Sequence, residues 1–152
     1  MITIVITAQI TAANTLLIWQ IGAATDGNIS HSFVELYNAA NTAVNLDGYS
    51  LQYAAGTKVS ANATQDGAWK KIDLSGTILP KHSFLILGKK GTTTNPALLI
   101  ENNYGDINDA AFELSNRAVK VALMSNTIPL DVNNPFDIDG LGAKAGAYAK
   151  SH

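Results

Sequence analysis

The hydrophobic positions of the chain recur mainly at every second residue. Apolar side chains alternate with smaller or polar ones through Ile2–Thr7, Tyr49–Tyr53 and Val119–Leu123. Because successive side chains of a strand point to opposite faces, each segment would turn one apolar face to a core and the other face outward. Phe33–Tyr37 is a further β-rich run, and no window has the pattern of a long amphipathic helix. The pattern predicts a chain built from β-strands.

Two short runs, Leu16–Ile21 and Phe84–Leu87, are apolar except for Gln20. Runs of this kind favour strands that are buried on both faces or that lie in the interior of a sandwich. Two longer stretches, Ala54–Ala68 and Gly88–Asp109, show no strand pattern and are expected to be loops. Loops of such length are either functional or merely mobile, and the sequence leaves both interpretations open.

Asp-Gly pairs separate several of these segments. Asp tolerates the left-handed backbone conformation and Gly adopts it at no steric cost, so such pairs favour tight reversals. Short strands joined by turns predict an all-β fold, an antiparallel β-sandwich. At 152 residues the chain fits one domain with one core. Cysteine is absent, which excludes disulfides and cysteine-ligated zinc.

The net charge is only −2, but it is unevenly distributed. Residues 58–90 carry +4, whereas residues 1–57 and 91–152 carry −3 each. The lysines of this block form a candidate binding site for a polyanion such as DNA or an anionic glycan, and Trp69 among them offers a surface on which a base or a sugar could stack. These lysines are Lys58, Lys70, Lys71, Lys81, Lys89 and Lys90. The alternative is a solvated face that keeps a charge-poor domain soluble.

No constellation of residues predicts catalysis. The simpler interpretation of Glu35 is an outward-facing strand carboxylate, because a catalytic acid needs a partner acid or a pKa raised in a cleft. His31, His82 and His152 lack the spacing of metal ligands and are expected in loops or on the surface. The serine-hydrolase pattern G-x-S-x-G does not occur. We therefore expect no enzyme, no catalytic residue, no cofactor and no metal centre.

Calcium binding stays open for one oxygen-rich stretch. Its candidate ligands are Asp131, Asn133, Asp137 and Asp139.

Five segments, taken in order, resemble the lamin tail domain family. The first is Phe33–Asn38, in which an acidic residue inside a strand precedes an aliphatic residue, an aromatic residue and a turn-forming Asn. The similarity runs from about Leu16 to Leu123. The remaining segments are Val44–Tyr53, Leu74–Pro80, Phe84–Ile86, and Leu114–Asn116 with Val119–Leu123.

The resemblance implies an immunoglobulin-like sandwich, in agreement with the periodicity, and it implies binding rather than catalysis. The expected organisation is an N-terminal extension at 1–14 that supplies an extra strand, a lamin-tail-like domain at 15–148 and a C-terminal tail at 149–152. The match looks closer to the bacterial branch, whose members are often appended to secreted or envelope hydrolases and nucleases. The family motif residues, expected to be structural, are Phe33, Glu35, Leu36, Tyr37, Asn38, Gly48 and Tyr49.

Together these features predict a binding or targeting module that mediates protein–protein interaction, or tethers a partner or attached domain, outside the cell or at the bacterial envelope. The alternative is an accessory domain that binds DNA or an anionic glycan through the lysine block. A charge-free edge strand such as Ile2–Thr7 would also allow a homodimer. No apolar run approaches the roughly 18 residues that span a bilayer, and no signal peptide is visible.

Overall fold

The computed structural model describes residues 15–24, 28–55, 69–116, 119–130 and 148–150. Within these residues the chain forms ten strands and no helix, and so no helix that could cross a membrane. The strands are β1 (Leu16–Gly22), β2 (His31–Asn38), β3 (Val44–Asn45), β4 (Ser50–Ala55), β5 (Lys70–Asp73), β6 (Thr77–Ile78), β7 (Ser83–Lys90), β8 (Ile107–Asn108), β9 (Val119–Met124) and β10 (Tyr148–Lys150).

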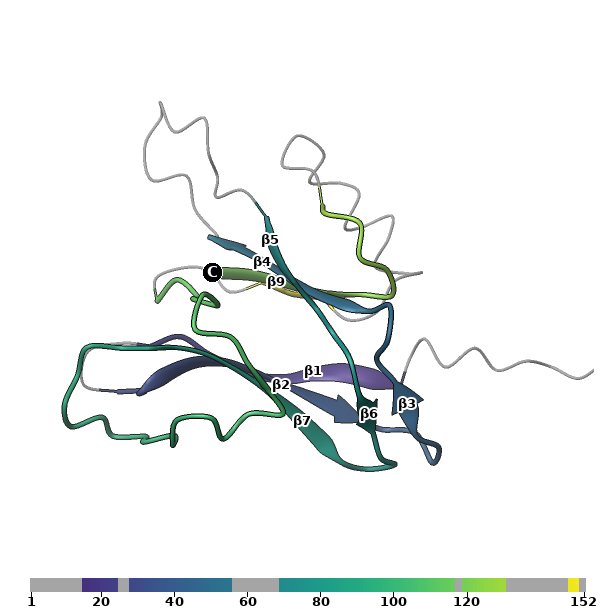
Figure 1. Ribbon diagram of the computed structural model, residues 1–152, viewed down its shortest axis with the longest axis horizontal. Coiled ribbons are helices and arrows are strands. Elements are labelled where there is room, and N and C mark those ends of the chain that lie inside the picture. Colours follow the sequence, from purple (N-terminus) through teal and green to yellow (C-terminus); the bar gives the residue numbers. More distant parts are fainter. Residues whose placement is uncertain (1–14, 25–27, 56–68, 117–118, 131–147, 151–152) are drawn as a thin grey trace, which may run out of the picture.

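Eight of these strands form two four-stranded sheets that stack as two layers (Figure 1). The first sheet has the order β1-β2-β7-β8, and the second has the order β10-β9-β4-β5. β3 and β6 form a two-stranded sheet at one end of the sandwich. The strand pairs are antiparallel except the short pair β7–β8, which is parallel. The predicted all-β antiparallel sandwich is confirmed, with one parallel pair at the edge of the first sheet.

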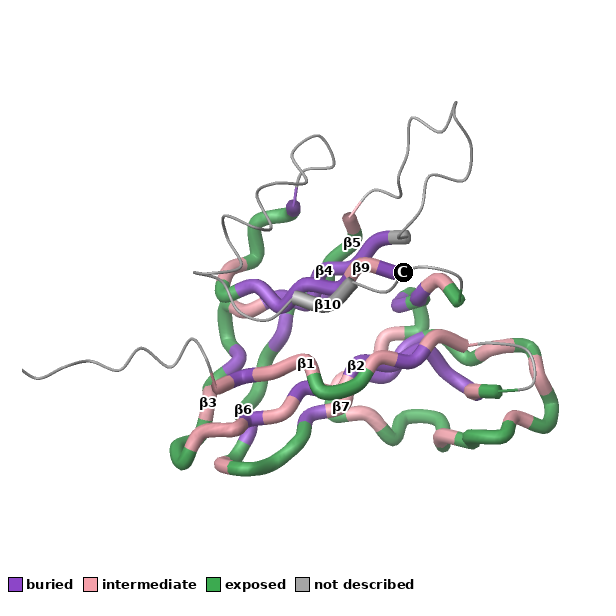
Figure 2. Tube along the Cα trace, turned by 180° about the vertical axis from the view of Figure 1, so that it is seen from behind, coloured by how far each residue is buried: buried purple, intermediate pink, exposed green. Residues whose placement is uncertain are grey.

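One hydrophobic core lies between the two sheets, and both contribute to it (Figure 2). Leu36 of β2 and Leu51 of β4 are fully buried. Phe112, which follows β8, is also fully buried, and its ring meets that of Tyr53 edge-on with ring centroids 4.8 Å apart. Such aromatic pairs add about 0.5–1.5 kcal/mol beyond the burial of their area. The Phe112 ring therefore ties the segment after β8 to the second sheet.

The strand boundaries correct the expectation for the two stretches predicted as loops. β4 continues to Ala55, and β7 continues through Gly88–Lys90. Within the second stretch, Ile107–Asn108 pairs with the centre of β7 as β8. Pairing with neighbouring strands overrides local composition here, because strand formation depends strongly on tertiary context. Residues 56–68 and the predicted strand Ile2–Thr7 lie outside the described residues.

Of the two alternatives for Leu16–Ile21, burial on both faces is wrong, whereas one face does line the sandwich interior, through Leu16, Ile18 and Ile21. β1 lies at the edge of the first sheet and pairs, among the described strands, with β2 alone. Its register shifts between Ile18 and Gln20, and both Trp19 and Gln20 are exposed at this bulge. The expectation holds for Phe84–Leu87, in which Leu85 is half-buried and the other three residues are buried. An apolar run alone does not distinguish the two cases.

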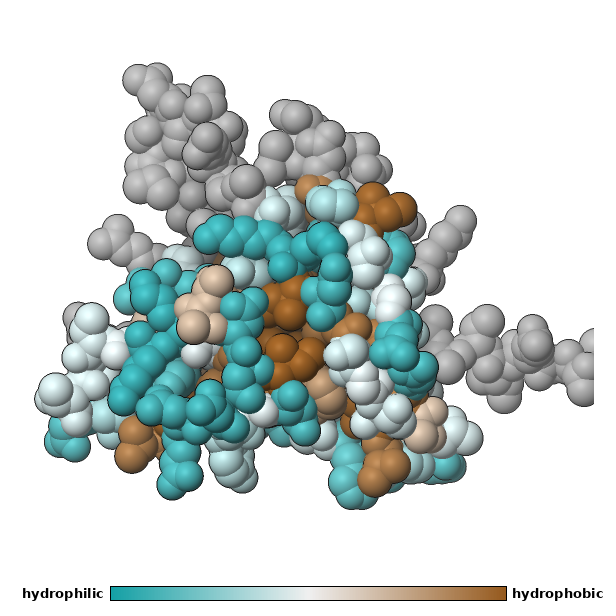
Figure 3. Space-filling view, viewed as in Figure 1, coloured by the Kyte–Doolittle hydropathy of each residue, from teal (hydrophilic) through white to brown (hydrophobic). Residues whose placement is uncertain are grey.

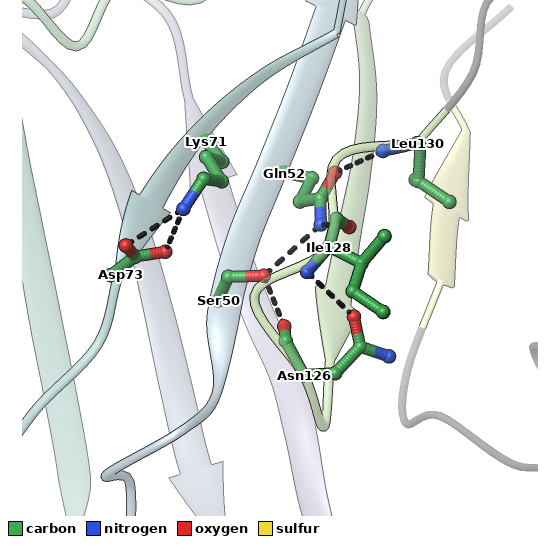
Figure 4. A network of polar contacts seen from close by, with 7 residues as sticks. All are labelled: Ser50, Gln52, Lys71, Asp73, Asn126, Ile128 and Leu130. Carbon is green, nitrogen blue, oxygen red and sulfur yellow. Dashed lines mark hydrogen bonds and ion pairs between the residues drawn. The ribbon is translucent and has the colours of Figure 1, made fainter.

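The outward face of β4 is covered rather than solvated. Ser50 and Gln52 alternate with the core residues as predicted, but both are completely buried. The segment after β9 folds over them (Figure 4). Gln52 Nε2 donates to the Ile128 carbonyl oxygen at 2.8 Å, and its Oε1 accepts from the Leu130 N–H at 2.8 Å. The Ser50 hydroxyl donates to the Asn126 carbonyl oxygen at 2.6 Å.

Candidate functional site

The lysine block is divided between the two sheets. Lys70 and Lys71 open β5, which is an edge strand of the second sheet. Lys89 and Lys90 end β7 of the first sheet. Figure 3 shows the side of the sandwich on which β5 and β7 lie in front, and hydrophilic side chains cover much of it. Lys58 lies outside the described residues.

Lys81 lies apart from the other lysines. It occupies the turn before β7, at the end of the strand opposite Lys89 and Lys90. Eight residues at about 3.3 Å each put roughly 25 Å between the two ends of β7. The Lys81 ammonium donates to the carbonyl oxygen of Ala39, so it serves the turn. The structure therefore does not bring the whole block to one surface.

Two lysines of the block are paired with carboxylates. Lys71 Nζ lies 2.6 Å from Asp73 Oδ1, and Lys89 Nζ lies 2.9 Å from Glu113 Oε1. Exposed pairs of this kind contribute only about 0–1 kcal/mol, so a phosphate or sulfate group could replace the carboxylate. Three lysines of the block form no ion pair with a described residue. Lys81 bonds to the carbonyl oxygen of Ala39, and the other two are Lys70 and Lys90.

The ring of Trp69 is already in contact with other side chains. It packs against the small cluster of Ala122, Met124 and Leu130 on the outer face of the second sheet. The ammonium of Lys120 lies 5.5 Å from the centre of the ring. Trp69 is consequently half-buried, and a base or sugar would have to displace Lys120 or use the remaining surface of the ring.

Asn38, the last residue of β2, is fully buried and ties the turns around it together. Its Nδ2 donates to the carbonyl oxygens of Thr42 at 2.8 Å, Ile78 at 3.1 Å and Leu79 at 3.2 Å. Its Oδ1 accepts from the Ala40 N–H at 2.9 Å. The geometry gives this motif residue a structural task.

Four further motif residues also lie in structural positions. The ring of Phe33 covers Gly22, where an added Cβ would lie only 2.2 Å from the ring. Leu36 is part of the core, and Tyr49 packs against it. Gly48 has a φ of 86°, in the left-handed region that a turn requires and that side chains disfavour.

An exposed aromatic surface, which the sequence interpretation missed, lies on the outer face of the first sheet. Trp19 is 59% exposed, and its ring packs against that of Tyr37 with centroids 5.3 Å apart. Leu17 pairs with Tyr37, and Glu35 pairs with Leu85 across the same sheet. We call these five residues the Trp19 face. Its signal in the sequence is a tryptophan in a charge-free run, but that signal becomes meaningful only once β1 is known to be an edge strand.

His31 is buried, contrary to the expectation of a loop or surface position. It opens β2 and is 3% exposed. Its Nδ1 lies 2.9 Å from Ser30 Oγ, and its Nε2 lies 3.1 Å from Asn102 Oδ1. Ser30 Oγ in turn accepts from the Ile100 N–H at 2.8 Å. The imidazole thus fastens the loop after β7 to the start of β2, through a partner that is too distant in sequence to be predicted.

A pocket of about 260 Å³ opens beside His31. The end of β7, the Asn102-Asn103 turn and the residues around the end of β8 line it. Its polar lining residues are His31, Lys90, Asn102, Asn103, Asn108 and Asp109.

The described residues contain no group of three or more His, Asp or Glu side chains that could hold a metal ion. His82 is exposed in a turn as expected, whereas His152 and the possible calcium stretch at 131–139 lie outside the described residues. The pKa of Tyr53 is raised, first by burial and then by the carboxylates of Asp109 and Glu113. This phenol belongs to the core, so its raised pKa does not mark an acid–base site.

These observations define a class: an immunoglobulin-like β-sandwich whose candidate sites are surfaces suited to binding. The family model of the Lamin Tail Domain matches residues 9–135, and the chain belongs to this family. The resemblance inferred from the sequence is thereby confirmed, over a range wider than Leu16–Leu123. The family is a non-enzymatic binding domain. A comparison with curated proteins found no match.

Proposed function

We propose that this protein is a non-catalytic interaction module that pairs an extended protein segment with the edge of β1 that no described strand occupies. The segment belongs to a partner protein, to an attached domain or to a second copy of the chain. The observation that carries the proposal is an uncharged edge strand that contains the exposed Trp19.

Two of the four edge strands of the large sheets, β1 and β5, differ in how they are protected. β5 has the sequence Lys-Lys-Ile-Asp, and charges of this kind discourage pairing with another sheet. β1 has the sequence Leu-Leu-Ile-Trp-Gln-Ile-Gly and carries neither a charge nor a proline. A free strand edge offers a row of main-chain donors and acceptors to an incoming strand. β1 is therefore the better docking edge of the two.

Because β1 contains a bulge, a docked segment would depend on side-chain contacts as well as on main-chain hydrogen bonds. The register shift between Ile18 and Gln20 interrupts the regular edge, so main-chain bonds alone would give a short ladder. Trp19 and Tyr37 supply apolar contact area at this point, on the outer face of the sheet. Aromatic side chains of this type dominate the energetics of protein interfaces.

The cellular setting is part of the same proposal. We place the protein outside the cell or at the envelope of a bacterium, where the module would tether a partner or a neighbouring domain such as a hydrolase or nuclease. The resemblance to the bacterial branch of the family and the excess of Thr, Ser, Asn and Gln over charged residues support this setting.

Light scattering after size-exclusion chromatography tests the self-pairing form of the proposal. The native chain should show a monomer–dimer equilibrium that depends on concentration. Trp19→Lys should weaken the dimer at least tenfold, about 1.4 kcal/mol, because it places a charge at the pairing edge. Ile128→Lys is the matched control, since Ile128 is 72% exposed on a loop of the other sheet.

A native chain that stays monomeric at high concentration would eliminate self-pairing. A dimer that survives Trp19→Lys would place the interface elsewhere. Removing residues 1–14 then distinguishes the two candidate edges: loss of the dimer in the shortened chain would assign the pairing to the N-terminal segment instead of β1.

A second candidate function, polyanion binding, is favoured by Lys70 and Lys90, which have no carboxylate partner among the described residues. Heparin or duplex DNA would then bind with an affinity that falls steeply with salt, at about 0.9 log unit per log unit of salt for each phosphate contacted. Replacing Lys70, Lys71, Lys89 and Lys90 by alanine should abolish binding, whereas Lys81→Ala should not. No retention on heparin at low salt would end this hypothesis.

A further inference from the structure

The pocket beside His31 is built by polar side chains that already have structural bonds. His31 uses both ring nitrogens, on Ser30 Oγ and on Asn102 Oδ1. Asn108 accepts from the Gly105 N–H at 3.0 Å and donates to the Gly105 carbonyl oxygen at 2.7 Å. These side chains hold the pocket lining in place, and most of their donors and acceptors are already bonded to other groups of the protein.

Four other groups keep capacity for a ligand. Because Asn102 Oδ1 faces His31, the Asn102 amide nitrogen remains without a partner in the described part of the chain. Asp109 accepts from the Ala111 N–H through Oδ1 at 2.8 Å, which leaves Oδ2 available. The Lys90 ammonium and the Asn103 carboxamide also bond to no described side chain or carbonyl. The pocket thus offers one cation, two amides and one carboxylate oxygen.

We propose that this pocket binds a sugar acid, a ring that carries several hydroxyls and one carboxylate. The Lys90 ammonium and the Asn102 amide would hold the carboxylate, because charge-assisted hydrogen bonds are the strong ones. The Asn103 carboxamide, which can both donate and accept, and Asp109 Oδ2 would bond to hydroxyls. A volume of about 260 Å³ is sufficient for one sugar ring.

The arrangement of the groups selects this ligand class over two simpler ones. A neutral sugar would leave the Lys90 ammonium without a partner. An amino acid without a side-chain hydroxyl would leave the Asn103 carboxamide without a partner. A ring with hydroxyls and a carboxylate matches all four groups at once.

Titration of the ¹⁵N-labelled native chain with glucuronic acid tests the proposal directly. Two-dimensional NMR should show saturable shifts of the Asn102 and Asn103 side-chain amides and of the Lys90 backbone amide. Glucose and alanine should bind at least about tenfold more weakly, because glucose lacks the carboxylate and alanine lacks the hydroxyls.

Two substitutions assign the binding to these groups. Lys90→Ala should weaken glucuronic acid binding about tenfold, with Lys70→Ala on the other sheet as the matched control. Asn102→Asp keeps an oxygen for His31 but turns the free donor into a charged acceptor, so it should abolish binding of the acid. Unchanged loop resonances in Asn102→Asp would verify that the wall is intact.

The proposal is overturned if glucuronic acid causes no saturable shift, or if glucose binds as well as glucuronic acid does. It is also overturned if both substitutions leave binding unchanged. Stronger binding of alanine than of glucuronic acid would replace the sugar acid by an amino acid. None of these outcomes depends on whether β1 pairs with a partner.

Discussion

At the scale of single residues, Asn38 shows how one buried polar side chain fixes several turns. Its four hydrogen bonds lie in a fully buried position. Asn38→Ala should lower the free energy of unfolding by about 2–4 kcal/mol, because buried carbonyl oxygens lose their donor. Urea denaturation measures the loss, with the exposed Asn41→Ala as control. A cost below about 1 kcal/mol would contradict the structural role of this motif residue.

Tyr53 gives a second prediction at this scale, through the pKa that burial, Asp109 and Glu113 raise. The folded chain keeps the phenol proton to higher pH than the unfolded chain. The contribution of the protonated Tyr53 phenol to the free energy of unfolding is therefore fully present below the ordinary tyrosine pKa of about 10. It is lost as the pH rises through the pKa that this phenol has in the folded chain. Tyr53→Phe should reduce the loss of stability above pH 10, whereas Tyr104→Phe, at an exposed position, should not. Equal alkaline destabilisation of Tyr53→Phe and the native chain would refute this assignment.

At the scale of elements, Gln52 latches the segment after β9 onto the outer face of the second sheet. Gln52→Leu keeps the size of the side chain but removes its bonds to Ile128 and Leu130. We expect the free energy of unfolding to fall by about 1–3 kcal/mol. Hydrogen exchange at the Leu130 N–H should become faster, because this group loses its acceptor. Ser50→Ala, which removes the bond to Asn126, should cost less. Unchanged exchange at Leu130 in Gln52→Leu would show that the latch does not hold the segment.

The sequence was most informative about individual strands. Alternation in Tyr49–Tyr53 and Val119–Leu123 predicted two strands and their core faces, because a side-chain period of two is a local property. Whether a face is solvated is not local: Gln52 is covered by residues 76 and 78 positions away. The same reason explains the edge position of Trp19 and the burial of His31. The candidate surfaces depend on which strands become neighbours, and local pattern does not encode that choice.

At the scale of the whole molecule, the shared core predicts that the two sheets unfold together. The chain has two tryptophans, Trp19 on β1 of the first sheet and Trp69 next to β5 of the second sheet. Trp19→Phe and Trp69→Phe therefore give two variants in which fluorescence reports on one sheet alone. Within each variant, the denaturant midpoint from fluorescence should coincide with the midpoint from circular dichroism, as expected for two-state unfolding.

Phe112 provides a second test of joint unfolding, because its ring joins the segment after β8 to Tyr53 of the second sheet. Phe112→Leu should destabilise the domain by about 1–2 kcal/mol and shift both single-tryptophan transitions equally. If the Trp19 signal shifted while the Trp69 signal did not, the sheets would be separate cooperative units. The edge of β1 would then be able to open without the rest of the domain, and a partner strand could enter the first sheet by displacement instead of by addition to a fixed edge.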